Sequence, residues 1–212
     1  FYYLRYPLCH GKNGPGMRGV LPVTWDELKR RGYPGAESQP DGAQAWVTVA
    51  TTRPETYLGD TAVAINPKDP RATALRGIHC ELPLVGRVIP IVEDDYVVLP
   101  AAMQADPEAA KSDPKGQFAT GFLKVTPAHD TNDYEIGRRH NLPVINVMAP
   151  DATISDKHGW PADDIGDAHL FIGLSREAAR KKVVEEFKAR TVGGESLLAD
   201  RKPYRHSVGH SY

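Results

Sequence analysis

The chain has 212 residues, with 26 basic and 27 acidic side chains and a formal net charge of −1, which suits one large domain or two small ones. This balance excludes a histone-like or strongly basic nucleic-acid binder, which would carry a large positive excess. No apolar run approaches the roughly 18 residues that span a membrane, and two cysteines are too few for a disulfide framework or a zinc site. We therefore expect no membrane association and a reducing, cytoplasmic compartment.

Short β-strands dominate the expected secondary structure. Alternating runs rich in branched and aromatic residues predict eight strands, with a weaker signal for one more in the turn-rich tail after residue 191. In chain order the strands cover residues 1–8, 46–52, 60–66, 80–84, 87–92, 96–99, 122–126 and 144–148. Residues 100–117 are expected to form a loop with a frayed helix.

Three helices are predicted from capping signals and hydrophobic periodicity. The first begins after Thr24, which forms a capping box with Glu27, and it stops at Gly32. The second covers residues 130–140 and has an acid in its first turn. The third, over residues 175–190, places charges on one face and four apolar residues on the other: Ala179, Val183, Val184 and Phe187.

The number and order of these elements predict the fold class. Strands outnumber helices and do not alternate strictly with them, so we expect an α+β domain with a β-barrel-like core of short mixed strands and a few peripheral helices. A doubly wound sheet is disfavoured for the same reason. The chain starts without Met inside an alternating run, so we expect a single domain, residues 1–212, cut from a longer protein.

A first polar segment follows the strand expected at 46–52. Five polar residues stand within six positions around Pro54: Thr51, Thr52, Arg53, Glu55 and Thr56. They fit a turn with side-chain caps. They equally fit the wall of a pocket whose short hydroxyl donors hold a small polar ligand.

A second polar segment surrounds the strand expected at 122–126. Lys124 lies within this apolar strand, and His129, Asp130 and Asp133 follow in the turn and the first helical turn. Capping by Asp130, with Asp133 complementing the helix dipole, leaves Lys124 and His129 without a role. The alternative is that all four converge at a strand-to-helix corner. A carboxylate pair beside a cation would there bind an ammonium and a hydroxyl together.

Other motifs carry no predicted chemistry. The histidines of 206–210 have neither nearby cysteines nor a helix to give them metal-binding geometry, and residues 11–19 lack the GxGxxG pattern of a dinucleotide site. Cys9 and Cys80 lack neighbours that would lower a thiol pKa, so we expect them to pack in the core. The sequence therefore predicts no metal and no cofactor in this domain.

The two polar segments carry a resemblance to a known family. The runs VATTRPETYLGDTAVAINPKDPR and ATGFLKVTPAHDTNDYEIGRRHNLPVINVM closely resemble the editing domain inserted in class I aminoacyl-tRNA synthetases, in the style of the valyl enzymes. The resemblance covers residues 1–8, 46–100, 116–150 and 170–212. Residues 9–45 are interpreted as a probable insertion, whereas residues 1–8 and 204–212 are expected to pair as a connecting ribbon.

The resemblance implies a hydrolase that edits mischarged tRNA. Such a domain hydrolyses the ester between a wrong amino acid and the terminal adenosine of the tRNA, and for a valyl enzyme that amino acid is threonine. Threonine and valine are nearly isosteric and are the known example of a pair that a hydrophobic pocket separates poorly. A second pocket favours threonine by hydrogen-bonding its hydroxyl, because valine would leave buried polar groups unpaired.

Roles for individual residues also follow from the resemblance. Asp133 matches the aspartate that holds the substrate α-ammonium, and with Thr51 and Thr56 it forms the expected catalytic set. No side chain is an obvious general base, so the pocket and the ribose hydroxyl are expected to position the water. The other expected site residues bind substrate: Thr52 in the hydroxyl wall, Arg53 on the adenosine or its phosphate, Phe118 against the terminal base, Lys124 and Asp130 around the threonine hydroxyl, and His129, which equally fits a structural turn.

The implied partners are the acceptor end of tRNA(Val) and, in cis, the ATP-binding catalytic body of the parent synthetase. The near-zero charge predicts weak tRNA binding by the domain alone, because phosphate neutralisation supplies most non-specific affinity. Two alternatives stay open. One is an isoleucyl- or leucyl-type editing domain, which the KVTPAHD run disfavours, and the other is a non-catalytic insert that only docks tRNA.

Overall fold

The fold is built on a mixed sheet whose strands follow one another around a barrel. The computed structural model describes residues 1–11, 20–104 and 114–203. Hydrogen-bonded neighbours follow the order β2-β1-β4-β5-β3-β6, and β9 pairs with β1 outside this path. The strands are β1 (Tyr2–His10), β2 (Trp46–Thr51), β3 (Ala62–Ile65), β4 (Ile78–Glu81), β5 (Val88–Glu93), β6 (Phe122–Val125) and β9 (Leu198–Arg201).

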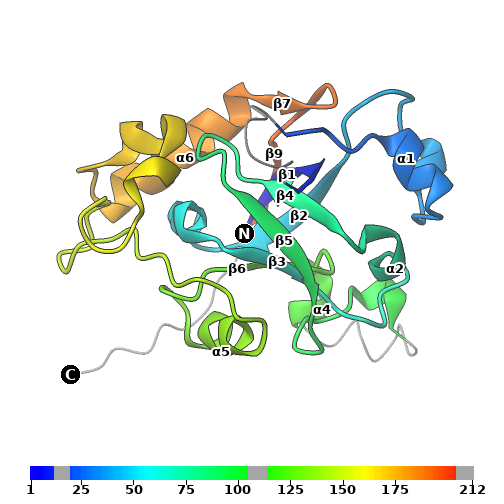
Figure 1. The fold of residues 1–212 in the computed structure, drawn as a ribbon, viewed down its shortest axis with the longest axis horizontal. Helices are drawn as coiled ribbons and strands as arrows, with labels where there is room; N and C mark the ends of the chain where they lie inside the picture. The colour runs from blue at the N-terminus through cyan, green and yellow to red at the C-terminus, as the bar shows by residue number, and fades with distance from the viewer. Residues whose placement is uncertain (12–19, 105–113, 204–212) are drawn as a thin grey trace.

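The two ends of this strand order, β2 and β6, lie side by side, so the sheet is nearly closed into a barrel (Figure 1). β3 and β5 run parallel, whereas β3 and β6 are antiparallel neighbours that pair Val63 with Lys124. A separate hairpin joins β7 (Thr191–Val192) to β8 (Glu195–Ser196). The prediction of an α+β, β-barrel-like fold is confirmed.

Helices lie around the barrel and do not alternate regularly with its strands (Figure 1). They are α1 (Trp25–Arg30), α2 (Ala72–Leu75), α4 (Pro114–Phe118), α5 (Thr131–Arg139) and α6 (Arg176–Ala189). Short 3₁₀ turns add η1 (Ala36–Ser38), η2 (Pro54–Gly59), η3 (Ala101–Met103), η4 (Ala162–Asp164) and η5 (Gly166–Phe171).

The three helices predicted from capping signals are confirmed as α1, α5 and α6. Their caps are Thr24, Asp130 and Ser175, and each side chain accepts a backbone N–H bond from the first helical turn. The capping box at α1 is only half formed, because the Glu27 carboxylate contacts His10 at 3.0 Å and Arg31 at 3.0 Å. The local signals therefore placed the helix starts correctly.

Helix α6 packs its apolar face against the turn that follows β2. Ala179, Val183 and Phe187 are fully buried, whereas Val184 is half-buried. The Phe187 ring meets the buried Tyr57 ring edge to face, with 5.0 Å between centroids. Because Tyr57 belongs to η2, the helix supports the segment that carries the first group of polar residues.

Two predicted strands are absent where backbone groups bind other partners. Residues 96–99 were expected to form a strand because they are branched or aromatic, but they form a turn, a bend and a stretch without regular secondary structure. The Asp94 side chain accepts a bond from the Tyr96 N–H at 2.9 Å, and the Val97 carbonyl accepts one from the Asn66 side chain at 2.8 Å. These side-chain bonds occupy groups that a sheet neighbour would need.

The strand expected at 144–148 is also wrong, and the one expected at 80–84 is shifted. Only an isolated bridge joins Met148 to Ile154 within the described residues, and the Val147 N–H donates to the His129 ring at 3.3 Å. β4 ends at Glu81 because the chain then turns back, with a bond from the Gly86 N–H to the Leu82 carbonyl at 2.8 Å.

Strand β1 connects several parts of the fold. It pairs with β2 along residues 2–7, with β4 near its end, and with β9 through Tyr2 opposite Arg201. The expected partner of residues 1–8, residues 204–212, lies outside the described residues, so the connecting ribbon stays a prediction. Within the probable insertion 9–45, Trp25 and Leu28 of α1 are buried in the main core.

A glycine turn before β6 offers a test of this packing. Gly121 has φ +84°, and an added Cβ would lie 2.1 Å from the Arg71 guanidinium, which is held by Asp69 at 2.7 Å and by the Thr120 carbonyl at 2.9 Å. We expect Gly121→Ala to lower the free energy of unfolding by about 2–5 kcal/mol, from backbone strain plus overpacking.

The matched control is Gly77→Ala, because Gly77 has φ +77° but open space where the Cβ would stand. This variant should cost only about 1–2 kcal/mol. Denaturant unfolding of both variants measures the difference, and equal losses would contradict the packing described around Gly121.

Candidate functional site

The predicted residues gather at the seam where β2 faces β6 without hydrogen bonds between them. A cavity of about 190 Å³ opens there. Its lining comprises Phe1, Ala50, Thr51, Thr52, Arg53, Thr56, Leu123, Lys124, Asp130 and Asp133. Two sequence segments that lie about 70 residues apart in the chain thus form one small, mostly polar space, as the second of the two interpretations of each segment required.

One wall of this cavity is the end of β2 and the start of η2. The chain turns at Pro54, whose fixed φ suits the first position of the 3₁₀ turn. The Thr51 hydroxyl accepts a bond from the Arg53 N–H at 3.0 Å, and the Thr56 hydroxyl donates to the Arg53 carbonyl at 3.0 Å. The threonines therefore hold the backbone of Arg53 by side-chain hydrogen bonds and line the cavity at the same time.

The opposite wall is the end of β6 and the start of α5. Asp130 caps the helix, since its Oδ1 accepts bonds from the Asn132 N–H at 2.9 Å and the Asp133 N–H at 3.3 Å. Its Oδ2 contacts the Arg53 guanidinium at 3.3 Å, and this guanidinium also donates to the His129 carbonyl at 2.9 Å. Arg53 thus joins the two walls by contacts on the exposed side of the cavity.

Asp133 is the most buried acid that faces the cavity. Its Oδ2 accepts a bond from the Thr126 N–H at 2.8 Å, and the residue is 8% exposed. Burial raises the pKa of Asp133 to about 6, although Lys124 and the Thr126 N–H act in the opposite direction. A role limited to the helix dipole would not require this burial.

Lys124 is held by a buried network that the sequence interpretation missed. Its ammonium donates to Asp60 Oδ1 at 2.9 Å and to the Thr126 hydroxyl. The Thr126 hydroxyl donates to Asp60 Oδ1 at 2.6 Å, and the Tyr6 hydroxyl donates to Asp60 Oδ2 at 2.7 Å. A lysine inside an apolar strand needs a buried counter-charge, so the acid next to β3 could have been identified by that requirement.

A second missed interaction fixes the turn after β2. The fully buried Glu55 accepts two bonds from the Arg180 guanidinium of α6, at 2.8 Å and 2.7 Å. Such a bidentate pair defines geometry as well as charge balance. Glu55 therefore anchors the hydroxyl wall to α6 and does not line the cavity itself.

His129 and Phe118 lie outside the small cavity. The His129 Nε2 accepts a bond from the Val147 N–H, and burial followed by the charges of Lys124 and Arg53 lowers its pKa to about 4. The ring is therefore neutral at pH 7 and supports the following loop, as the structural alternative required. The Phe118 ring stacks on Phe1, with 4.8 Å between centroids.

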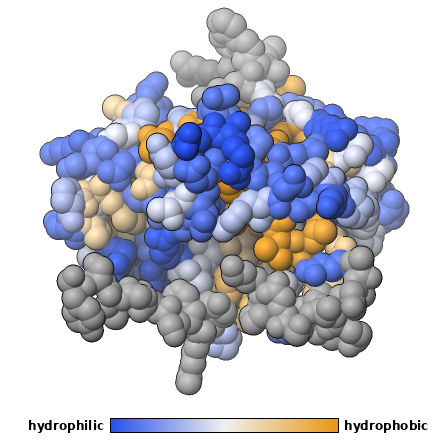
Figure 2. Space-filling view, turned by 90° about the horizontal axis from the view of Figure 1, so that it is seen from below, coloured by the Kyte–Doolittle hydropathy of each residue, from blue (hydrophilic) through white to orange (hydrophobic). Residues whose placement is uncertain are grey.

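Phe118 lines a larger, more apolar cavity of about 470 Å³ next to the first. The two cavities share Phe1, Ala50, Thr52, Leu123 and Asp130. The rim of the larger one includes Tyr96 and Val98, which are exposed. Seen from below, on the side of α4 and α5, the surface is mostly hydrophilic with separate hydrophobic patches (Figure 2).

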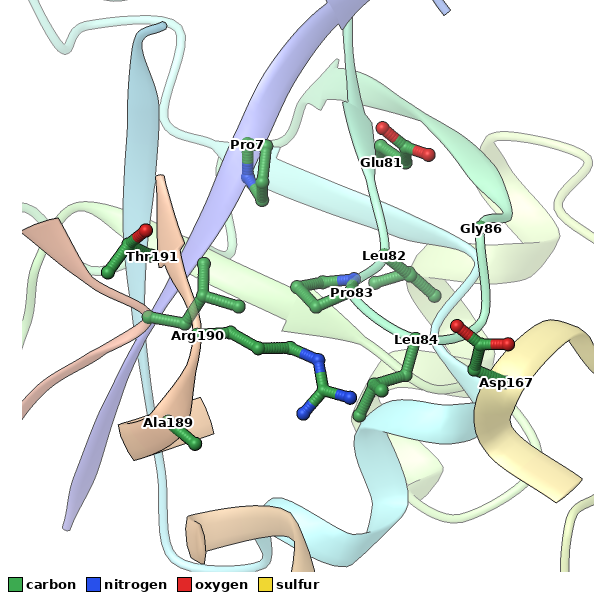
Figure 3. Close-up of a pocket in the computed structure, with 11 residues that line it drawn as sticks. Pro7, Glu81, Leu82, Pro83, Leu84, Gly86, Asp167, Ala189, Arg190 and Thr191 are labelled. Atoms are coloured by element: carbon green, nitrogen blue, oxygen red, sulfur yellow. The ribbon is translucent and has the colours of Figure 1, made fainter. Parts of the chain in front are cut away.

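A third cavity, of about 470 Å³, lies elsewhere and holds none of the predicted residues (Figure 3). The turn after β4 and the end of α6 form its sides, and the Arg190 side chain extends between them toward Leu84. Arg190 forms an ion pair with Glu186, which also pairs with Lys182. We see no convergent set of reactive groups in this space.

The charges around the small cavity leave one group unbalanced. Lys124 is paired with Asp60, and Arg53 is paired with Asp130. Among the described residues, Asp133 alone lines the cavity as an acid without a cationic partner in hydrogen-bond contact. Above pH 6 the cavity therefore carries a negative charge that suits an ammonium group.

Metal sites and membrane-spanning helices are absent from the described residues. The described ranges contain no group of three or more His, Cys, Asp or Glu side chains placed to hold a metal ion. Within them, every helix is too short or too polar to cross a bilayer. The expectation that the domain needs no metal or cofactor stays a prediction.

Comparisons with known proteins give sequence relatives but no matching protein-family model. The chain is 45% identical over 211 residues to a valine–tRNA ligase of Laribacter hongkongensis, covering 90% of this chain and 20% of that enzyme. It is 44% identical over 173 residues to the Lactococcus lactis enzyme, covering 82% and 16%, and 43% identical over 194 residues to the Carboxydothermus hydrogenoformans enzyme, covering 91% and 18%.

A search of solved structures finds the crystal structure of GlLeuRS-CP1, with a TM-score of 0.48 and 12% sequence identity, covering 86% of this chain and 94% of that one. The sequence relatives and the two motifs together show that the chain belongs to the class I aminoacyl-tRNA synthetases and corresponds to their editing domain. More particularly, it is homologous to one segment of valine–tRNA ligases and spans at most about a fifth of their length.

The raised pKa of Asp133 predicts that this residue opposes stability at neutral pH. The folded chain binds the Asp133 proton more tightly than the unfolded chain, so the stabilising contribution is present below about pH 4 and is lost as the pH rises to about 6. We expect Asp133→Asn to raise the free energy of unfolding at pH 7 by on the order of 2 kcal/mol.

Urea unfolding at pH 7 and at pH 4 measures this effect, since the advantage of Asp133→Asn should shrink at the lower pH. The exposed Asp163 provides a control, because Asp163→Asn should change stability little at either pH. A loss of stability for Asp133→Asn at pH 7 would contradict the assignment of a desolvated, unpaired carboxylate.

Proposed function

We propose that this domain hydrolyses the aminoacyl ester of mischarged tRNA, with threonyl-tRNA(Val) as its substrate. The observation that carries the proposal is the unbalanced charge of Asp133 in a small polar cavity that adjoins a larger apolar one. The 3′ end of an aminoacyl-tRNA has the matching form, since a small cationic amino acid is joined to a large, flat adenosine.

The two cavities suggest how the substrate lies. The small cavity has room for about six water molecules, at roughly 30 Å³ each, which suits one amino acid of threonine size. The α-ammonium would then contact Asp133, and the ester would lie near Thr51 and Thr56. The terminal base would enter the larger cavity near Phe118, and the exposed Arg53 would reach the ribose or phosphate.

Threonine would be favoured over valine because polar groups surround its side chain. Lys124 and Asp130 line the cavity together with Asp133 and offer a donor and an acceptor for the threonine hydroxyl. Valine would displace water from these groups without offering a hydrogen bond in its place, at a cost of about 1–3 kcal/mol for each donor or acceptor position left unsatisfied.

The proposed chemistry uses water and groups already in place. A water oxygen attacks the ester carbonyl, the bond from this carbon to the ribose oxygen breaks, and the ribose oxygen takes a proton. The products are free threonine and tRNA with an intact terminal ribose. Thr51, Thr56 and the neighbouring ribose hydroxyl would position the water, and we propose no metal or cofactor of the domain's own.

We further propose that the acceptor end of tRNA(Val) is delivered by the catalytic body of the parent synthetase in cis, in the cytoplasm. The formal charge of −1 supports this arrangement, because the domain has little excess positive charge for tRNA. A domain that only docks tRNA, or one of isoleucyl or leucyl specificity, would give different outcomes in the tests below.

The first test removes the partner of the substrate ammonium. In the full-length synthetase, Asp133→Ala should slow hydrolysis of threonyl-tRNA(Val) by about 10- to 100-fold, the equivalent of one charge-assisted hydrogen bond. Deacylation of preformed threonyl-tRNA measures the rate, with the exposed Asp163→Ala as control. Unchanged hydrolysis by Asp133→Ala would overturn the role of Asp133, and no hydrolysis by the unmodified enzyme would overturn the proposed function.

The second test concerns discrimination. Lys124→Met and Asp130→Ala should each narrow the ratio between the hydrolysis rates of threonyl- and valyl-tRNA(Val), because the hydroxyl loses a polar partner. Equal loss of rate on both substrates would mean that these residues position the ester. Preferred hydrolysis of valyl-tRNA(Ile) carrying the isoleucine anticodon by the unmodified enzyme would favour the isoleucyl alternative.

A further inference from the structure

We propose that Asp60, which does not line the cavity, is a positioning residue that keeps the charge of Lys124 away from Asp133 and so preserves the binding place of the substrate ammonium. This inference rests on the proposed function. It adds a third acid to the site, one that has no direct contact with substrate.

The side chain of Asp60 is fixed on every side. It is fully buried, and its two oxygens accept bonds from Lys124, Thr126 and Tyr6 at 2.9, 2.6 and 2.7 Å. Its backbone carbonyl accepts a bond from the Arg87 guanidinium at 2.8 Å. Burial raises the pKa of Asp60, and the charge of Lys124 with the hydrogen bonds from Thr126, Lys124 and Tyr6 acts in the opposite direction, so all three donors favour the ionised form.

Thr126 lies between the carboxylates of Asp60 and Asp133 and donates a hydrogen bond to each. Its hydroxyl donates to Asp60 Oδ1 at 2.6 Å, and its N–H donates to Asp133 Oδ2 at 2.8 Å. Lys124 lines the same cavity as Asp133 yet has its ammonium bonded to Asp60 at 2.9 Å. The Lys124 ammonium therefore lies near two acids but forms its ion pair with Asp60, the one that does not line the cavity.

Loss of the Asp60 charge would leave the Lys124 ammonium without its ionic partner. A buried ammonium requires a counter-charge, and Asp133 is the acid that remains near Lys124. An ion pair between Lys124 and Asp133 would occupy the carboxylate that the substrate ammonium needs. Burial is the main cause of the raised pKa of Asp133, the charge of Lys124 opposes it, and the charges of Asp130 and Asp60 add to the rise.

The test is a double-mutant cycle in the full-length synthetase with Asp60→Asn, Lys124→Met and both together. We expect Asp60→Asn to lower kcat/KM for threonyl-tRNA(Val) by about tenfold or more, mainly through KM, because a competing cation weakens binding. In the Lys124→Met background the same change should have little effect, since the competing cation is gone. A purely structural role of the ion pair would also couple the two changes, but in the melting temperature, and it would not give a rise in KM that depends on Lys124.

A conservative pair of variants covers the case in which Asp60→Asn does not fold. Tyr6→Phe removes one donor to Asp60, whereas Tyr57→Phe removes an equally buried hydroxyl that donates to the Pro83 carbonyl at 3.1 Å. Both should lower the melting temperature similarly. Only Tyr6→Phe should raise KM, by about two- to fivefold, and this rise should vanish when Lys124→Met is present.

The outcomes separate this inference from the proposed function. If the unmodified enzyme hydrolyses threonyl-tRNA but Asp60→Asn retains its KM, or if Asp60→Asn costs as much with Lys124→Met as without it, the inference about Asp60 is wrong and the function stands. If the unmodified enzyme hydrolyses no mischarged tRNA, both are overturned. A KM effect that depends on Lys124 supports both.

Discussion

A lysine buried in the wall of a β-barrel requires a counter-charge, and the pair formed by Lys124 and Asp60 meets this requirement at the seam between the barrel ends. Lys124 belongs to β6, and Asp60 lies two residues before β3, the antiparallel neighbour of β6. The pair therefore joins two adjacent strands by their side chains where the strand β2 on the other side offers no hydrogen bonds. Around this contact lie Thr126, Asp133 and the small cavity.

Incomplete closure of the barrel is what leaves room for a site. Full hydrogen bonding between β2 and β6 would bring their backbones to about 4.8 Å and fill the space with side chains. Here the seam is bridged at its exposed side by Arg53, through Asp130 and the His129 carbonyl. The hydroxyl wall on β2 is in turn anchored from outside by Glu55 and Arg180. Rigid supports thus surround a small open space, as a binding site requires.

Features with local causes were predictable from the sequence. The starts of α1, α5 and α6 follow from capping residues that stand next to the helices they cap, and β1 and β2 follow from alternation alone. Residues 96–99 and 144–148 are also rich in branched residues, yet their backbone groups bind the side chains of Asn66 and His129. Such a composition indicates suitability for a strand and contains no information about whether a neighbouring strand is present.

The site shows the same difference between features with local causes and features that depend on distant residues. Its wall residues stand in two compact motifs, so their convergence could be anticipated. The residues that support them could not, because Lys124 meets Asp60 across 64 positions and Glu55 meets Arg180 across 125. His129 illustrates the limit, since its place in the motif fitted either role and only the bond from the Val147 N–H, with the lowered pKa of the ring, favours the structural one.

The pairing of β1 with β9 has a consequence for how the chain folds. These strands come from opposite ends of the described chain, and Tyr2 lies opposite Arg201. Ordering such distant residues costs loop-closure entropy before any contact compensates for it, so high sequence separation slows folding. During synthesis on the ribosome, one flank of β1 stays unpaired until residues 198–201 emerge. This exposed edge is a place where a chaperone or another nascent chain would bind.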